Sequence, residues 1–182
     1  AEAVARAERD TRALAAAYRA QGYAHSRLGA PRRAIPLLRA AIRAAGLAGD
    51  QRLRGLAHIS LSSALLDAGR LSAARREFDR ALCDLDGVDA ARCENLRLVI
   101  ALGSGDVGAA VDSVDDAIAV LAAADDVLWS SRLRFNRAVA LIEVGRLAEA
   151  ERDLELAQRG YDRLDLAQAV LDCQAARARL ES

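Results

Sequence analysis

Residues 126–150 read DVLWSSRLRFNRAVALIEVGRLAEA, and residues 50–74 read DQRLRGLAHISLSSALLDAGRLSAA. Both stretches begin with an aspartate, place a glycine nineteen residues later, and place an alanine five residues after that glycine. The aspartate suits the start of a helix, where its side chain accepts hydrogen bonds from free backbone N–H groups. The glycine suits the end of a helix, because it takes the left-handed cap conformation without a Cβ penalty. The pattern predicts a helix, a tight turn and a second helix.

This pattern occurs four times, at spacings of 40, 36 and 40 residues. The aspartates are Asp10, Asp50, Asp86 and Asp126, and the glycines are Gly29, Gly69, Gly105 and Gly145. Two rows of alanine follow the glycines, namely Ala34, Ala74, Ala110 and Ala150, then Ala41, Ala81, Ala117 and Ala157. A spacing of seven puts both rows on one face of the second helix of each pair. That face is predicted to pack closely against a neighbouring helix.

The register gives a map of the whole chain. The first helices of the pairs are predicted over 11–28, 51–68, 87–104 and 127–144, and the second helices over 31–46, 71–84, 107–123 and 147–163. Residues 1–9 align with the end of an earlier second helix, and residues 166–182 with the first helix of a fifth unit. We therefore expect an all-α protein, an α-solenoid of antiparallel helix pairs with about nine helices and a partial N-terminal helix.

The predicted solenoid is one domain spanning residues 1–182. Its repeat units are 11–50, 51–86, 87–126 and 127–165, with partial units at 1–10 and 166–182. Both ends interrupt a repeat, which predicts a fragment of a larger protein.

The composition supports helices and excludes other classes. The chain has 43 Ala and 27 Leu but only 2 Pro, and these abundant residues are strong helix formers. With 53% apolar residues and a net charge of zero, a disordered chain is excluded. No run of about 18 uncharged apolar residues exists to span a membrane.

The A-x3-F spacing of Ala74 and Phe78, which follows a glycine turn and precedes Ala81, resembles the tetratricopeptide repeat (TPR). The front half of that motif is similar to Tyr18 through Gly22 in the first unit and to Asn136 through Leu141 in the fourth. The units of 36–40 residues are longer than the nominal 34, the front-half Leu is replaced by arginine, and the trailing Pro is absent.

The stretch from Asp126 to Ala150 is similar to TPR units that precede caspase-like CHAT peptidase domains in high-GC actinobacteria. That resemblance implies that any catalytic Cys and His belong to a domain outside this chain.

The TPR resemblance implies a partner-binding concave face lined by the first helices. The residues that it assigns to this face are Arg19, Tyr23, Ile59, Ser63, Arg92, Asn95, Arg132, Phe135, Asn136 and Val139. Arg92 and Arg132 occupy one repeat position and are expected to recur on one rim. A mostly apolar groove suits an amphipathic helix or a hydrophobic segment.

No catalytic, cofactor or metal site is predicted. The three cysteines lack metal-ligand spacing, and we expect them to be small buried hydrophobes in a reducing cytoplasm, although Cys83 and Cys93 flank one loop and could lie closer. His25 and His58 occupy different repeat positions, and nothing places either beside a cysteine. The G-x-G-x-x-G match at 103–108 lies between two helices, whereas a dinucleotide fingerprint follows a strand.

The charges are unevenly distributed along the chain. Residues 1–97 hold 17 Arg and 11 acidic residues, whereas residues 98–182 hold 9 Arg and 15 acidic residues. This asymmetry fits a mixed solvated surface, an acidic partner at the basic half, or weak head-to-tail self-association. Nucleic acid is not an expected partner, because the net charge is zero and the aromatic residues are scattered.

The sequence therefore predicts a non-catalytic scaffold or sensing module for protein–protein interaction, which binds a peptide or a helical segment. Two alternatives remain open at this point. One is a ligand-sensing repeat domain of a signalling ATPase or transcription regulator, and the other is a structural self-assembly module.

Overall fold

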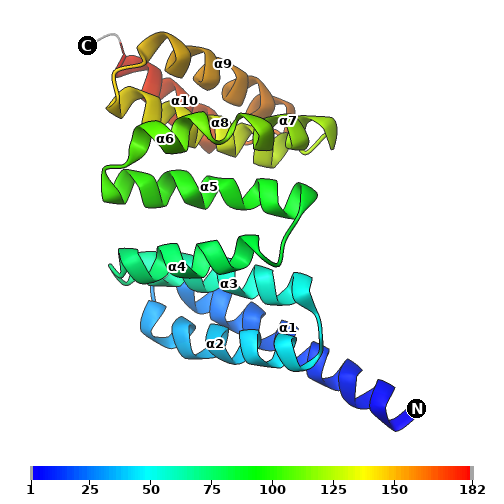
Figure 1. Ribbon diagram of the computed structural model, residues 1–182. Coiled ribbons are helices and arrows are strands. Elements are labelled where there is room, and N and C mark those ends of the chain that lie inside the picture. The colour runs from blue at the N-terminus through cyan, green and yellow to red at the C-terminus, as the bar shows by residue number, and fades with distance from the viewer. Residues whose placement is uncertain (1, 181–182) are drawn as a thin grey trace. The chain divides into compact units, whose positions relative to one another are not determined.

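Ten α-helices joined by short turns account for the described part of the chain (Figure 1). The computed structural model describes residues 2–180, with side chains from residue 9 onward, and none of residues 2–180 lies in a strand. The helices are α1 (Glu2–Arg27), α2 (Pro31–Leu47), α3 (Gln51–Asp67), α4 (Leu71–Leu82), α5 (Gly87–Ser104), α6 (Val107–Asp112), α7 (Asp115–Ala123), α8 (Val127–Glu143), α9 (Leu147–Arg163) and α10 (Ala167–Ala178). The predicted all-α class is confirmed.

The helices form two compact units, Ala1–Asp86 and Gly87–Ser182. In the first unit, α1 packs on α2, α2 on α3, and α3 on α4, while α1 also contacts α3. In the second unit, α5 and α8 contact each other and both contact α6 and α7, while α9 packs against α8 and α10. The division falls at the predicted boundary between the second and third repeat units.

The four glycines of the repeat end their helices as predicted. Gly29, Gly69, Gly105 and Gly145 have φ between 69° and 78°. After Gly69, the Arg70 N–H donates to the Leu65 carbonyl at 2.8 Å, and after Gly145 the Arg146 N–H donates to the Leu141 carbonyl at 2.9 Å. These bonds close the Schellman motif and satisfy carbonyls that the helix end would otherwise leave free.

A second row of left-handed residues ends the second helices, and the sequence pattern did not predict it. The row comprises Gly49, Asp125 and Asp165, with φ of 65°, 51° and 54°. Aspartate tolerates this conformation better than most residues because its short polar side chain can hydrogen-bond locally. The next residue of each turn again donates to a carbonyl five residues back, as Asp126 does to Leu121 at 2.9 Å.

The aspartate row is confirmed as a set of helix caps at two of its four positions. The Asp50 carboxylate accepts from the Leu53 N–H at 2.9 Å, and the Asp126 carboxylate accepts from the Trp129 N–H at 3.3 Å. Asp10 lies inside α1, which runs unbroken from Glu2 to Arg27. The prediction that residues 1–9 form the end of a separate helix is therefore wrong. No glycine or proline occurs in residues 1–20 to stop the helix.

The second helix of the third unit, predicted over 107–123, is broken into α6 and α7 at Ser113 and Val114. The Ser113 hydroxyl donates to the Ala110 carbonyl at 3.0 Å, a local bond that competes with regular helix geometry. Asp115 and Asp116 then occupy the first turn of α7, where their charges oppose the positive end of the helix dipole.

Both alanine rows are buried as predicted. Ala34, Ala74 and Ala150 have no exposed surface, and the other five alanines are at most 7% exposed. The larger core residues lie beside these alanines, with Leu38, Phe78, Val114 and Leu154 at 2% exposure or less. In the second unit the main cluster joins residues of α5 to α9 with Ala176 of α10.

Replacing Gly69 or Gly145 with alanine should lower the free energy of unfolding by about 1 kcal/mol or more, because a Cβ strains the left-handed conformation. Gly103 lies inside α5 and is exposed. Gly103→Ala should be neutral or stabilising because alanine restricts the unfolded chain. Thermal or urea unfolding of the three variants provides the measurement, and the reverse ranking would contradict the assignment.

Ala74→Leu should destabilise the first unit by about 1–3 kcal/mol, because the contact has no room for a larger side chain. Ala124 is exposed at the end of α7 and provides a matched control. Ala124→Leu should change stability by less than about 0.5 kcal/mol. Equal effects of the two substitutions in urea unfolding would refute the close packing of the alanine rows.

Candidate partner-binding surfaces

The predicted site residues of the first unit lie on α1 and α3, two helices in contact. We call this surface the α1–α3 face, made of Arg19, Tyr23, Ile59 and Ser63. The Tyr23 side chain is 55% exposed, whereas the other three are half-buried. The Arg19 Nε is buried and makes no hydrogen bond. The face therefore combines an exposed aromatic ring with a guanidinium nitrogen that lacks an acceptor.

The predicted site residues of the second unit lie on α5 and α8, which also contact each other. We call this surface the α5–α8 face, made of Arg92, Asn95, Arg132, Phe135, Asn136 and Val139. The structure pairs two of them directly, because the Asn136 side-chain amide Nδ2 donates to the Asn95 side-chain Oδ1 at 2.5 Å. This bond fixes the two helices against each other within the predicted site.

Arg92 and Arg132 share a repeat position but make different contacts. Arg92 bonds Asp126 at the start of α8, with Nη2 2.6 Å from the carboxylate. The exposed guanidinium of Arg132 lies over the Trp129 ring, 5.3 Å from its centroid. Only Arg132 leaves its donors open to a partner, since a cation–π contact does not use the N–H groups.

Phe135 and Val139 are half-buried, whereas residues that line an open groove would be exposed to solvent. The Phe135 ring packs against the main core of the second unit and against a second cluster that includes Tyr161 and Cys173. Phe135 therefore contributes to the stability of the second unit.

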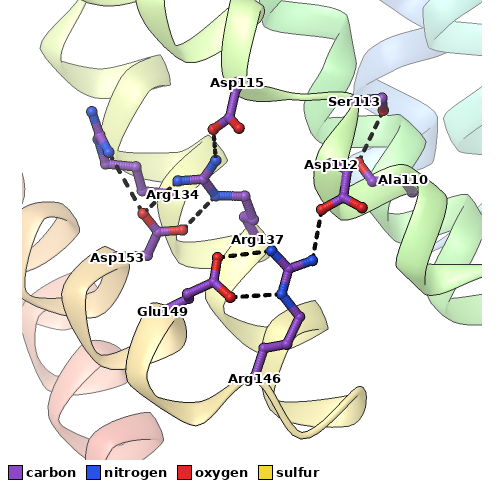
Figure 2. A network of polar contacts seen from close by, with 9 residues as sticks. All are labelled: Ala110, Asp112, Ser113, Asp115, Arg134, Arg137, Arg146, Glu149 and Asp153. Carbon is purple, nitrogen blue, oxygen red and sulfur yellow. Dashed lines mark hydrogen bonds and ion pairs between the residues drawn. The ribbon is translucent and has the colours of Figure 1, made fainter.

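A network of ion pairs ties α8 to α7 and α9 (Figure 2). Arg137 binds the Asp153 carboxylate through two parallel bonds of 2.5 and 2.8 Å and also bonds Asp115. Arg134 approaches the same Asp153 at 3.5 Å. Burial lowers the pKa of the Arg137 guanidinium, but its bonds to Asp153 and Asp115 outweigh burial and raise that pKa overall, so it stays charged.

A second arginine of the network joins α6 to α9. Arg146 binds Glu149 through bonds of 2.7 and 2.8 Å and bonds Asp112 at 2.6 Å (Figure 2). The hydrogen bond from Arg146 lowers the pKa of Glu149. Asp112 and Asp115, which lie on either side of the break between α6 and α7, are exposed, and each bonds an arginine.

The repeat register could have revealed part of this network. Arg134 and Asp153 belong to the fourth repeat unit. They occupy the same repeat positions as His58 and Glu77 of the second repeat unit, which is part of the first compact unit. There the His58 Nδ1 lies 2.7 Å from the Glu77 carboxylate, and both side chains are largely buried. An arginine or histidine at the first of these positions, with a carboxylate at the second, is therefore a signal for a cross-helix contact.

Another ion pair fixes the turn after α4. The Arg54 guanidinium bonds both oxygens of Asp84, at 2.5 and 2.7 Å. Gly55 makes the approach possible, since a Cβ at that position would lie 2.6 Å from the Leu85 Cγ. The hydrogen bond from Arg54 holds the pKa of Asp84 below its usual value.

Asp84→Asn should lower the free energy of unfolding by about 1–3 kcal/mol at pH 7, where the charged pair forms. A carboxyl group with a lowered folded pKa contributes stability above its unfolded pKa of about 3.9, and this contribution is lost as the pH falls through the folded pKa. The cost of the substitution should therefore shrink below about pH 4. Thermal melts between pH 7 and pH 2.5 provide the measurement.

The control for this experiment is Asp86→Asn, which removes an exposed carboxylate two residues away. It should change stability by less than about 0.5 kcal/mol at every pH. An Asp84→Asn cost that does not change with pH would show that the ion pair does not stabilise the fold.

The three cysteines are free, and their surroundings differ. Cys93 and Cys173 are buried as predicted, but Cys83 is exposed, which corrects the prediction that all three are buried. Desolvation raises the pKa of Cys93 to about 12 and that of Cys173 to about 11. Both thiols therefore stay protonated near neutral pH and are poor nucleophiles.

A comparison with protein-family models finds no match, and a comparison with curated proteins finds no significant one. Within the residues that the structure describes, no group of three or more His, Cys, Asp or Glu side chains could hold a metal ion. None of the helices in that part of the chain is both long and apolar enough to cross a membrane. The TPR and CHAT resemblances remain predictions.

Proposed function

We propose that this chain is a non-catalytic protein–protein interaction module, a TPR-type α-solenoid whose first helices bind a peptide or helical segment. The observation that carries the proposal is Tyr23, a 55% exposed aromatic ring on the α1–α3 face. Aromatic and arginine side chains dominate the energy of most protein interfaces. Arg19 lies one turn before Tyr23, and the exposed Arg132 of the α5–α8 face adds a guanidinium whose N–H groups are open to a partner.

The chemistry of the two faces favours a protein segment as the ligand. Half-buried Ile59 and Val139 offer apolar contact, while Ser63 and the arginines offer hydrogen bonds. An amphipathic segment presents both kinds of group along one side. The buried, protonated thiols of Cys93 and Cys173 are poor nucleophiles, and free buried thiols fit a reducing cytoplasm, which we propose as the location.

Tyr23→Ala and Arg132→Ala should each weaken partner binding by about 1–3 kcal/mol while the thermal melt stays nearly unchanged. Binding is measured by calorimetry with the partner that the wild-type chain captures from the source cells. Phe135 is unsuitable for this test because its ring packs against the core.

The matched controls are Arg75→Ala on α4 and Arg152→Ala on α9, both exposed on second helices. These variants should retain binding within about 0.5 kcal/mol, as expected for side chains outside an interface. Loss of binding in the controls, with retention in the Tyr23 and Arg132 variants, would refute the proposal.

A further inference from the structure

The two compact units carry opposite charges, and the second helices account for much of the difference. The first unit holds 15 arginines and 9 acidic residues, and the second holds 11 arginines and 17 acidic residues. Helix α2 contains four arginines and no acidic residue, whereas α6 and α7 contain three aspartates and no basic residue. Complementary potentials steer association and select partners.

The first unit has a depression of about 320 Å³ between α2, α3 and α4. We call it the basic depression, and its lining residues are Arg39, Ile42, Arg43, His58, Leu61, Glu77 and Arg80. Arg39 and Arg43 are exposed and make no ion pair with any described residue. Arg80 bonds the Glu77 carboxylate at 2.7 Å, and the His58 ring bonds that carboxylate as well. Two arginines are therefore left with open donors.

The basic depression also has apolar walls, supplied by Ile42 and Leu61. An occupant that fits it needs a carboxylate for the arginines and an aliphatic group for the apolar surface. A nucleic acid fits less well, because the walls offer no aromatic ring on which a base could stack.

The second unit carries a surface with this composition. We call it the acidic ridge, made of Asp112, Asp115, Asp116 and Val120 on α6 and α7. Asp116 is exposed and has no partner among the described residues, and Val120, four residues later on the same side of α7, is 38% exposed. The Asp112 and Asp115 side chains are 68% and 75% exposed even though each bonds an arginine.

We propose that the basic depression of one chain binds the acidic ridge of a second copy. Asp116 meets Arg39 and Arg43, and Val120 covers Ile42. The contact joins two different surfaces, so in a pair one copy keeps a free acidic ridge and the other keeps a free basic depression. These free surfaces can extend the assembly or close it into a ring. The paired side chains of this self-association lie on α2 and α7, and none of them belongs to the α1–α3 or α5–α8 face.

Sedimentation equilibrium of the wild-type chain tests whether the contact forms. At about 0.05 M salt the chain should associate as its concentration rises to about 1 mM, the range that resolves weak contacts. At about 0.5 M salt the association constant should fall at least tenfold, because the shorter Debye length screens exposed charges. A wild-type chain that stays monomeric throughout would overturn the proposal.

Two variants locate the contact by disabling one surface each. The double variant Arg39→Glu with Arg43→Glu and the single variant Asp116→Arg should each associate at least about tenfold more weakly than wild type. An equimolar mixture of the two should form heterodimers. The first variant keeps the acidic ridge and the second keeps the basic depression, so one native contact remains. Failure of the mixture to associate would overturn the pairing of these two surfaces.

The matched control is Arg75→Glu with Arg76→Glu on α4, which makes the same change in charge outside the depression. It should weaken association by less than about threefold, because the remaining effect is long-range. An equal loss in the control would show that net charge, not the basic depression, drives association. Circular dichroism melts verify that every variant is folded, and Arg39→Gln with Arg43→Gln repeats the test without introducing negative charge.

Discussion

Close approach between paired helices is the constraint on which the rest of the structure depends. At these contacts the residues are alanines, which present only a methyl group, or glycine, which has no side chain. Ala34, Ala74 and Ala150 are fully buried, and a Cβ at Gly160 would lie 1.9 Å from the Ser131 hydroxyl oxygen. Such close packing gives each buried atom many van der Waals contacts, and it leaves no room for an added methylene group.

Alanine buries little apolar surface, so other residues must supply additional stabilisation where alanines form the helix contacts. The larger side chains beside the alanine rows, such as Leu38 and Phe78, each bury more apolar surface than an alanine can. Cross-helix ion pairs add geometric definition, as Arg137 does by binding Asp153 of α9 and Asp115 of α7. Breaking a buried pair is costly because it leaves an uncompensated charge, so such pairs restrict how the helices can shift.

The division between first and second helices also divides the surfaces that could act in recognition. The first helices expose Tyr23 and Arg132, which suit a folded or helical segment of another protein. The second helices expose the arginines of α2 and the aspartates of α6 and α7, which suit each other. The two proposals thus assign partner binding and self-association to different surfaces of one fold.

The sequence by itself determined the turns, most helix bounds and the buried rows, because these depend on residues close together in the chain. Gly69 and Gly145 each end a helix by adopting a positive φ, which is a property of the single residue. The alanine spacing follows from helical geometry. Only the tertiary structure decided that Arg137 binds Asp115 and that Asn136 binds Asn95. Those contacts depend on which helices pack together, and the helices concerned are far apart in the chain. The repeat register gives a residue's position within its unit, but it does not give the residue that this side chain contacts.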